Sequence, residues 1–253
     1  VLISKTVLPL AAHDSTIDSI YLIEDYKKSL VSKIGLAFRL LNRYDNIYLL
    51  QPNSVNGFYA AFCNAKHKAF LIAYTRKWYH GIFYQTADVV RLHQKTDFTL
   101  ESYLKLADPS LSAESYTKHA TLPLWIPEKT LPELAASKQV KIGISISAGN
   151  KAKTIPTAVW IKILNTLAGL PCQFYVFGPE NEQKYLDQLL EKLSARENII
   201  NLIGKLKLHE VPHAISQMDM YIASDSGNVY IADAVNIPVV CLAGPCALTE
   251  QHP

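Results

Sequence analysis

Polar and glycine residues follow strand-like segments at four places in the second half of the chain. The first is Ser224-Asp-Ser-Gly-Asn228, which comes after an apolar run and before a helical pattern. Backbone N–H groups at the start of a helix bind anions, Ser226 adds a hydroxyl donor, and Asp225 can accept from ribose or sugar hydroxyls. Spacing alone favours a plainer interpretation, in which these residues only cap the helix.

The second place is the loop of residues 147–156, which contains Gly149, Lys151 and Lys153. Gly149 permits close approach of the backbone, and lysines beside a helix N-terminus suit the charge of a diphosphate. A solvated basic loop is the alternative interpretation. The nucleotide-binding patterns GxxxxGK[ST] and GxGxxG are both absent from this loop.

The other two places are Phe177-Gly-Pro-Glu180 and Gly244-Pro245. Glu180 either bonds ligand hydroxyls or favours the positive end of its own helix. If the preceding segments form one parallel sheet, all four turns lie at the same edge of it. The set then predicts a ligand site more strongly than any one member does.

Short apolar runs alternate with longer amphipathic segments, which predicts βα units and an α/β fold with parallel sheet. Strands are expected at residues 19–23, 46–50, 69–72, 140–146, 173–177, 199–203, 220–223 and 238–242. Helices are expected at residues 29–43, 55–65, 156–167, 180–194 and 208–217, and again after the turn up to residue 235. Residues 74–119 are less regular and are expected to be mostly helical.

Three prolines recur within residues 122–132 and predict a linker, since proline fits neither a helix interior nor a central strand. We therefore expect two Rossmann-like domains, residues 1–124 and residues 125–253, which face each other across a cleft. Ligands of this architecture bind at the carboxyl ends of the strands.

The composition indicates a folded protein. With 253 residues, 49% of them hydrophobic and 19% charged, the chain is neither collagen-like, coiled-coil nor disordered. A net charge of +3 is too balanced to indicate a nucleic-acid partner. No segment is apolar enough to cross a membrane and no signal peptide is recognisable, so a cytoplasmic protein is expected. Four cysteines without ligand-like spacing are expected to be reduced thiols: Cys63, Cys172, Cys241 and Cys246.

Five segments make the second half of the chain recognisable by their order. They are Lys-Ala-Lys-Thr-Ile-Pro (151–156), Val-Phe-Gly-Pro-Glu (176–180), residues 201–211, Ala-Ser-Asp-Ser-Gly (223–227) and residues 237–245. Together they resemble the lipopolysaccharide heptosyltransferases, which are GT-B glycosyltransferases of family 9. The likeness is close over residues 140–253 and weaker in the first half, around residues 44–51 and 65–68.

The resemblance implies an inverting, metal-independent transfer of a heptose or related sugar from an ADP-sugar to the lipopolysaccharide core. It implies a phosphate contact at Lys153, a nucleotide contact at Glu180, and a diphosphate and sugar site at Asp225, Ser226 and Gly227. No cofactor is expected besides the donor substrate. A UDP-sugar transferase or a sugar-nucleotide epimerase of the same fold stays open, because no motif of the chain reads the base.

Two departures from the family's pattern concern catalysis. Tyr230 stands where the family usually has His, and it is counted among the nucleotide-sugar residues. The family's opening strand and Gly-Asp loop, which supplies the expected base, has no counterpart. We therefore expect a chain that is incomplete at both ends, and we assign no catalytic base. A catalytically silent GT-B binding protein is the alternative that these departures favour.

The expected acceptor surface is basic and aromatic. Cations beside flat rings suit the carboxylates and phosphates of a lipopolysaccharide core, and they would add peripheral attraction to the anionic head groups of the inner membrane. An ordinary solvated face is the alternative. The residues concerned are Lys66, Lys68, Arg76 and Lys77, with His67 and Trp78 beside them.

Overall fold

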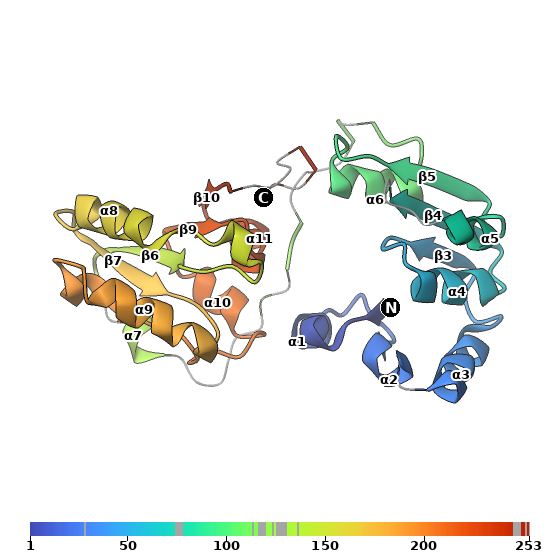
Figure 1. Ribbon diagram of the computed structural model, residues 1–253, viewed down its shortest axis with the longest axis horizontal. Helices are drawn as coiled ribbons and strands as arrows, with labels where there is room; N and C mark the ends of the chain where they lie inside the picture. The colour runs from blue at the N-terminus through green and yellow to red at the C-terminus, as the bar shows by residue number, and fades with distance from the viewer. Residues whose placement is uncertain are drawn as a thin grey trace. The chain divides into compact units, whose positions relative to one another are not determined.

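The computed structural model describes residues 1–27, 29–73, 78–112, 114–115, 120–122, 124, 131–135, 137–244, 249–250 and 252. These residues form two compact units (Figure 1). Unit 1 draws on residues 1–8, 18–118 and 247–252, and unit 2 on residues 9–17, 119–246 and 253. Residue 125 and most of the expected linker lie outside the described residues, so the domain boundary stays a prediction.

Unit 1 contains a three-stranded parallel sheet in the order β3-β4-β5 and a separate parallel pair, β1-β2. Its strands are β1 (Leu2–Ile3), β2 (Tyr21–Leu22), β3 (Asn46–Leu49), β4 (His67–Ala73) and β5 (Val89–His93). Its helices are α2 (Ile23–Lys27), α3 (Leu30–Leu40), α4 (Ser54–Phe62), α5 (Gly81–Tyr84) and α6 (Thr99–Ala107), with 3-10 turns η1 (Lys5–Val7) and η2 (Trp78–His80). The short helix α1 (Leu8–Ala11) follows η1 in the chain.

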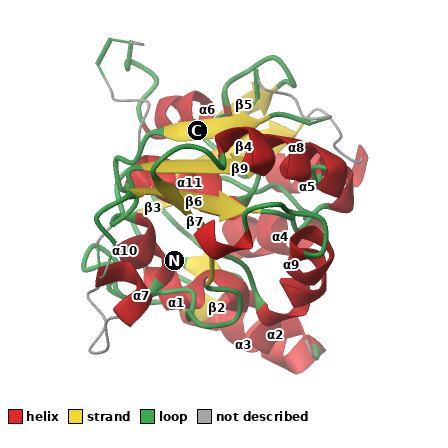
Figure 2. Cartoon of the chain, turned by 90° about the vertical axis from the view of Figure 1, so that its left-hand side faces the viewer, coloured by secondary structure: helices red, strands yellow, loops and turns green. Residues whose placement is uncertain are grey.

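Polar side chains fix where the helices of unit 1 begin. Ser29 and Ser32 form a reciprocal capping box at the start of α3, and the Asn53 side chain accepts from two backbone N–H groups of α4. Apolar side chains then cover both faces of the sheet: Leu106 of α6 packs on one face, and Ala60 of α4 on the other. The result is a helix–sheet–helix layering. Figure 2 distinguishes the helices and strands of the chain by colour.

Unit 2 contains a five-stranded, fully parallel sheet in the order β10-β9-β6-β7-β8. Its strands are β6 (Val140–Ser145), β7 (Cys172–Val176), β8 (Ile199–Asn201), β9 (Met220–Ser224) and β10 (Val239–Leu242). Its helices are α7 (Pro132–Ala135), α8 (Thr157–Leu167), α9 (Gln183–Leu190), α10 (Val211–Ile215) and α11 (Gly227–Ala234). Its 3-10 turns are η3 (Lys151–Lys153), η4 (Glu180–Glu182) and η5 (Arg196–Asn198).

Two apolar clusters lie on the two faces of this sheet. Trp160 of α8 and Leu186 of α9 pack on one face, and Ile215 of α10 and Val229 of α11 pack on the other. Alternate residues of β7 and β9 feed alternate clusters, as the two-residue period of a strand requires, whereas β6 contributes Ile142 and Ile144 to the first cluster only. The strands are thus buried on both faces, which explains their nearly continuous apolar sequence.

The α/β class and its parallel sheets are confirmed. The expectation that residues 74–119 are mostly helical is wrong at β5, where residues 89–93 pair with β4 along the sheet. Five residues are too few to show a helical or strand period, and Arg91 interrupts the apolar run there.

Candidate functional site

The strand order of unit 2 reverses between β6 and β9. Strands β7 and β8 extend the sheet on one side of β6, whereas β9 and β10 extend it on the other. In open α/β sheets, ligands bind at the carboxyl ends of the strands that flank such a reversal. The loop that carries Lys153 follows β6, and the turn of Asp225 and Ser226 follows β9. Two of the predicted sites therefore meet at this reversal.

The loop after β6 contains a 3-10 turn, and residues 149–152 of it are exposed. Asn150 caps the 3-10 turn η3 by accepting from the Ala152 N–H at 3.1 Å. Gly244, which follows β10, lies against the same turn: a Cβ on Gly244 would stand 3.7 Å from the Cα of Lys153. Lys153 is thus presented from a loop that two strand ends support. Pro245 lies outside the described residues.

Lys153, Asp225 and Tyr230 form a hydrogen-bonded cluster, hereafter the donor cluster. Lys153 Nζ donates to Asp225 Oδ2 at 2.5 Å, and the Tyr230 hydroxyl donates to Asp225 Oδ1 at 3.0 Å. The Asp225 side chain is 5% exposed and that of Lys153 is 25% exposed. A buried carboxylate requires such partners, and the partly exposed ammonium of Lys153 is accessible to an anion. Tyr230, in the place of the expected His, keeps a contact with Asp225.

The hydroxyls beside the donor cluster do not cap the helix. Ser226 occupies the N-cap position of α11, but its side chain makes no capping hydrogen bond, so the interpretation of Ser226 as a plain cap is wrong. Within the described part of the chain, Ser224 Oγ and Ser226 Oγ are both buried without a hydrogen-bond partner. A Cβ on Gly227 would meet none of the described atoms within 4 Å. The start of α11 therefore offers open space and unsatisfied donors, which is what an anionic ligand needs.

A second, deeper network fixes the strand ends below this turn. The Tyr221 hydroxyl and Ser145 Oγ share a hydrogen bond of 2.7 Å, and Asn228 Nδ2 donates to the same Ser145 Oγ at 3.0 Å. Burial raises the pKa of Tyr221 well above its ordinary value, so the phenol stays neutral. The network ties β6, β9 and α11 together. Sequence reasoning did not identify this network. Its signal in the sequence was Gly143, a residue without a side chain that leaves room for the Tyr221 ring on the neighbouring strand.

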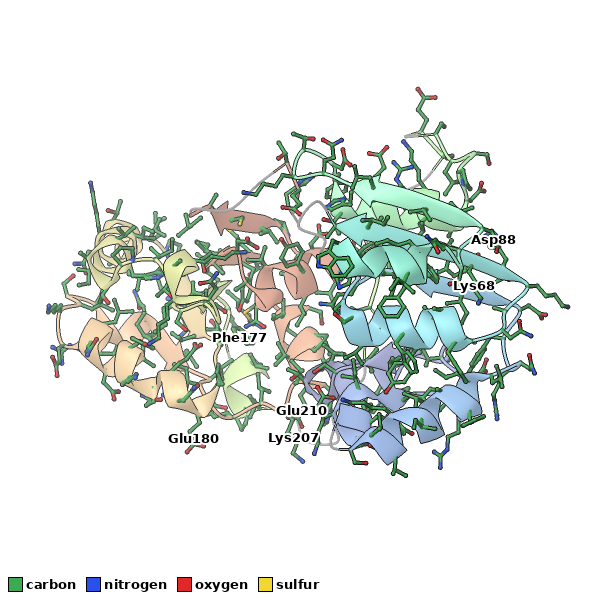
Figure 3. The ribbon with its side chains drawn as sticks, turned by 45° about the vertical axis from the view of Figure 1, so that its right-hand side comes forward. Lys68, Asp88, Phe177, Glu180, Lys207 and Glu210 are labelled. Atoms are coloured by element: carbon green, nitrogen blue, oxygen red, sulfur yellow. The ribbon has the colours of Figure 1, made fainter. Side chains whose placement is uncertain are left out.

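The turn after β7 holds Glu180 and Glu182 in different surroundings. Glu180 is exposed, and its side chain points outward from unit 2 (Figure 3). Glu182, two residues later, reaches back: its Oε2 lies 2.6 Å from where a Cβ on Gly178 would stand. Gly204, whose φ is +71°, donates its N–H to the Gly178 carbonyl at 2.9 Å and holds this turn closed. The role of Glu180 stays a prediction.

The expected acceptor lysines lie at the amino end of β4. Lys66 forms an exposed ion pair with Asp45 at 2.8 Å, and Lys68 Nζ donates to the Ala61 carbonyl at 2.9 Å. The Lys68 backbone N–H is held by Asp88 in unit 1 (Figure 3). Ligands of such sheets bind at the opposite edge, so these contacts give the acceptor surface no support and it stays a prediction. Arg76 and Lys77 lie outside the described residues.

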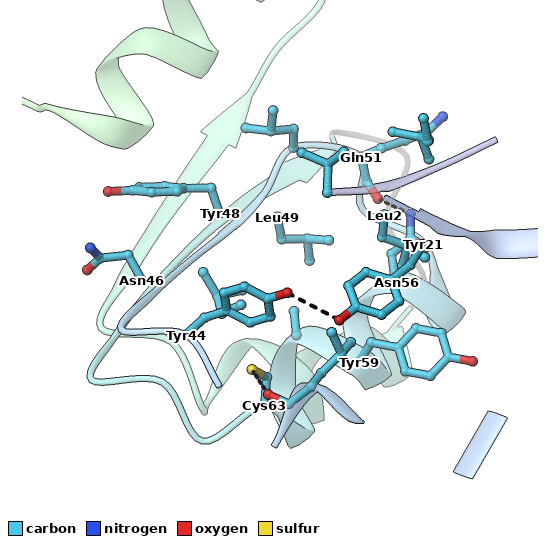
Figure 4. A pocket seen from close by; sticks show the side chains of 16 residues that line it. Leu2, Tyr21, Tyr44, Asn46, Tyr48, Leu49, Gln51, Asn56, Tyr59 and Cys63 are labelled. Carbon is cyan, nitrogen blue, oxygen red and sulfur yellow. Dashed lines mark hydrogen bonds between the residues drawn. The ribbon is translucent and has the colours of Figure 1, made fainter. Parts of the chain in front are cut away.

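Unit 1 has a pocket of about 550 Å³ between β1 and β3 (Figure 4). Its lining is mostly apolar, with four tyrosines among the sixteen residues. A hydrogen bond to Tyr21 and burial raise the pKa of Tyr44 to about 12. Tyr59 is 3% exposed, and its hydroxyl has no hydrogen-bond partner among the described residues.

Replacing Tyr59 with phenylalanine is therefore expected to raise the free energy of unfolding by about 1 kcal/mol, because it removes a buried hydroxyl that gains no hydrogen bond. The matched control is Tyr221→Phe, which deletes a hydroxyl bonded to Ser145 and is expected to destabilise by about the same amount. Urea unfolding of both variants measures the difference. Destabilisation by Tyr59→Phe would contradict the expectation.

No described helix combines the length and the apolar character needed to cross a membrane. Among the same residues, no group of three or more His, Cys, Asp or Glu is placed to hold a metal ion. The expected metal-independent transfer stays a prediction.

Comparison with known proteins identifies relatives of this chain. The model of the family described as "Glycosyltransferase family 9 (heptosyltransferase)" matches residues 36–253. A curated relative, lipooligosaccharide heptosyltransferase 2 of Haemophilus influenzae, is 30% identical over 96 residues, which make up 37% of this chain and 28% of the relative. The aligned part thus spans less than a third of that relative's length.

Solved structures resemble this one along nearly its whole length. A family 9 glycosyl transferase from Veillonella parvula has a TM-score of 0.78 at 15% identity, covering 96% of this chain and 72% of that one. E. coli ADP-heptose lps heptosyltransferase II has a TM-score of 0.69 at 19% identity, covering 95% and 73%. E. coli heptosyltransferase WaaC with ADP-2-deoxy-2-fluoro heptose has a TM-score of 0.68 at 12% identity, covering 100% and 79%. At these identities the likeness is one of fold, and the expected GT-B fold is confirmed.

Proposed function

The chain belongs to glycosyltransferase family 9, the heptosyltransferase family, and we propose that it transfers a heptose or a related sugar from an ADP-sugar to the inner core of lipopolysaccharide or lipooligosaccharide. The donor is proposed to bind in unit 2. Peripheral contact with the inner membrane from the cytoplasmic side belongs to the same proposal.

The observation that carries the proposal is the donor cluster at the strand reversal of unit 2. One accessible ammonium, one paired carboxylate and the unsatisfied hydroxyl of Ser226 surround the open start of α11. A diphosphate needs cations and N–H donors, and a sugar needs carboxylate and hydroxyl partners. The loop after β6 supplies the cation, and the turn after β9 supplies the carboxylate and the hydroxyl. Both kinds of group therefore lie at the strand reversal.

The chemistry follows from these groups. The acceptor hydroxyl oxygen bonds to the anomeric carbon of the donor while the bond from that carbon to the diphosphate breaks. Attack from the face opposite the diphosphate inverts the configuration. Negative charge develops on the departing diphosphate, where Lys153 and the first N–H groups of α11 stabilise it. Protein cations in this role make a metal unnecessary, and the base that takes the acceptor proton is left unassigned.

The choice of an ADP-sugar rests on the relatives. One solved structure of this fold is named for ADP-heptose and another holds an ADP-sugar analogue. Tyr230 supports an active enzyme over a silent binding protein, because its hydroxyl holds Asp225 in the place where His was expected. The family name supports the lipopolysaccharide or lipooligosaccharide acceptor.

Calorimetry with ADP, ADP-heptose and UDP tests the donor site. We expect ADP and ADP-heptose to bind more tightly than UDP, and Ser226→Ala to weaken ADP binding about tenfold through the loss of one buried hydrogen bond. Ser194→Ala is the control, since that hydroxyl bonds Asn165 elsewhere in unit 2 at 2.8 Å. Preference for UDP, or equal affinity in the Ser226→Ala protein, would refute the proposed site.

A further inference from the structure

One helix of unit 1 exposes an apolar stripe. Leu30, Val31, Ile34 and Phe38 of α3 follow helical spacing, and the first two are 72% and 80% exposed, with Phe38 at 62%. The opposite side of α3 is the buried one, where Leu36 sits in the core. The helix is therefore apolar on two sides, and only one of them is covered among the described residues.

Aromatic rings of the next helix extend the stripe into a patch. Phe38 meets Phe62 of α4 edge to face at a centroid distance of 5.8 Å, and Phe62 stacks on Phe58 at 5.9 Å. Phe58 and Phe62 are themselves exposed. We name these six residues the α3–α4 patch: Leu30, Val31, Ile34, Phe38, Phe58 and Phe62. Helices α3 and α4 are neighbours in unit 1 (Figure 1).

The segment that contains this helix is basic. Residues 23–43 contain 5 of the 25 Lys and Arg residues but only 2 of the 22 Asp and Glu residues. That segment carries a net charge of +3. Asp45, just beyond it, is already paired with Lys66. Lys33 and Arg39 stand on α3 itself, and Arg39 donates a hydrogen bond to the Tyr26 hydroxyl at 3.3 Å.

We propose that the α3–α4 patch is a membrane-docking surface, which inserts its apolar side chains among the acyl chains of an anionic bilayer while Lys33, Arg39 and Arg43 meet the head groups. An apolar face with aromatic rings and flanking cations is the pattern of helices that lie in a bilayer interface. An exposed apolar cluster alone would suit a protein partner equally well. The coincidence of the patch with a segment of net charge +3 favours an anionic lipid surface.

This inference rests on the proposed function, because a transferase whose acceptor is anchored in a membrane must work at that membrane. Docking through unit 1 would hold the enzyme beside its acceptor and raise the local acceptor concentration. Donor binding in unit 2 needs no membrane, so the two proposals can fail separately.

Vesicle flotation of the full chain tests the surface. We expect binding to vesicles of phosphatidylethanolamine and phosphatidylglycerol, and much weaker binding to phosphatidylcholine alone. Val31→Asp with Phe38→Asp is expected to reduce binding at least about tenfold. Lys33→Glu with Arg39→Glu is expected to do the same at low salt, and to show little effect at high salt, where both proteins bind weakly. Leu170→Asp is the control, since Leu170 is 55% exposed in unit 2.

Transfer assays separate docking from catalysis. With a water-soluble, deacylated core acceptor, the Val31→Asp, Phe38→Asp protein is expected to keep its rate, whereas with vesicle-embedded acceptor it should lose about tenfold. Thermal unfolding confirms that each variant is folded. Vesicle binding equal to that of the unsubstituted chain, or equal loss on both acceptors, overturns the docking surface. If the unsubstituted chain is a dimer and the same substitutions make it a monomer, the patch binds a second copy of the chain. That result would also overturn the membrane-docking surface.

Discussion

Replacing Lys153 with alanine is expected to slow sugar transfer by about a hundredfold or more and to lower the free energy of unfolding by about 2 kcal/mol. The rate is expected to fall because the proposed function makes Lys153 one of the cations that stabilise the departing diphosphate. The stability falls because the Asp225 side chain, only 5% exposed, loses its ion-pair partner at 2.5 Å. Steady-state kinetics with an ADP-sugar and urea unfolding measure the two effects.

A second substitution separates these effects. Adding Asp225→Asn to Lys153→Ala removes the unpaired buried charge, so the free energy of unfolding should recover while the rate should stay low. Lys162→Ala, which removes an exposed lysine of α8, is the control for loss of charge and should change neither quantity. Recovery of the rate together with the stability would mean that Lys153 serves only to pair Asp225.

The sheet of unit 2 could be predicted from the sequence because its strands are buried on both faces. Residues 140–146 and 220–223 are almost entirely apolar, and each is followed by a Gly- and Ser-containing turn. Such runs admit few other structures. Strand β5 of unit 1 could not be predicted in the same way, because it is short. Its exposed positions also carry the apolar residues Val90 and Leu92, so polarity does not distinguish its exposed positions from its buried ones.

The sequence located the turns of the candidate site but not all of their side chains. Lys153 and Asp225 were expected on the same sheet edge, and the structure brings them into contact although 72 residues separate them. The outward direction of the Glu180 side chain could not be predicted, because it depends on which way a single 3-10 turn faces. Ser226 resembled a cap in sequence, and only its lack of a capping bond distinguishes the two roles.

Helical spacing also left open which side of α3 is buried. The apolar residues between positions 29 and 43 fit a helix, and that helix is confirmed over residues 30–40. Because apolar side chains lie on more than one side, the period does not select the core side. Contacts with Tyr59 and Cys63 make Leu36 and Leu40 the core residues, and leave Phe38 outside.

Replacing Gly143 with alanine is expected to lower the free energy of unfolding by about 2 to 3 kcal/mol, which would lower Tm by roughly 5 to 10 °C. Gly143 lies in β6, the central strand of the unit 2 sheet, and a Cβ there would stand 2.4 Å from Cδ2 of the Tyr221 ring. The ring has no room to retreat, because it is fully buried and its hydroxyl is bonded to Ser145 at 2.7 Å. Calorimetric unfolding measures the change.

The collision with the ring can be isolated by a double-mutant cycle. In a Tyr221→Ala background the ring is absent, so Gly143→Ala should cost less than about 1 kcal/mol, and the coupling between the two sites should equal the difference. Gly169→Ala is the matched control, since a Cβ there would meet nothing within 4 Å in the described part of unit 2. An equal cost of Gly143→Ala in both backgrounds would show that the strand backbone, and not the Tyr221 ring, requires glycine at this position.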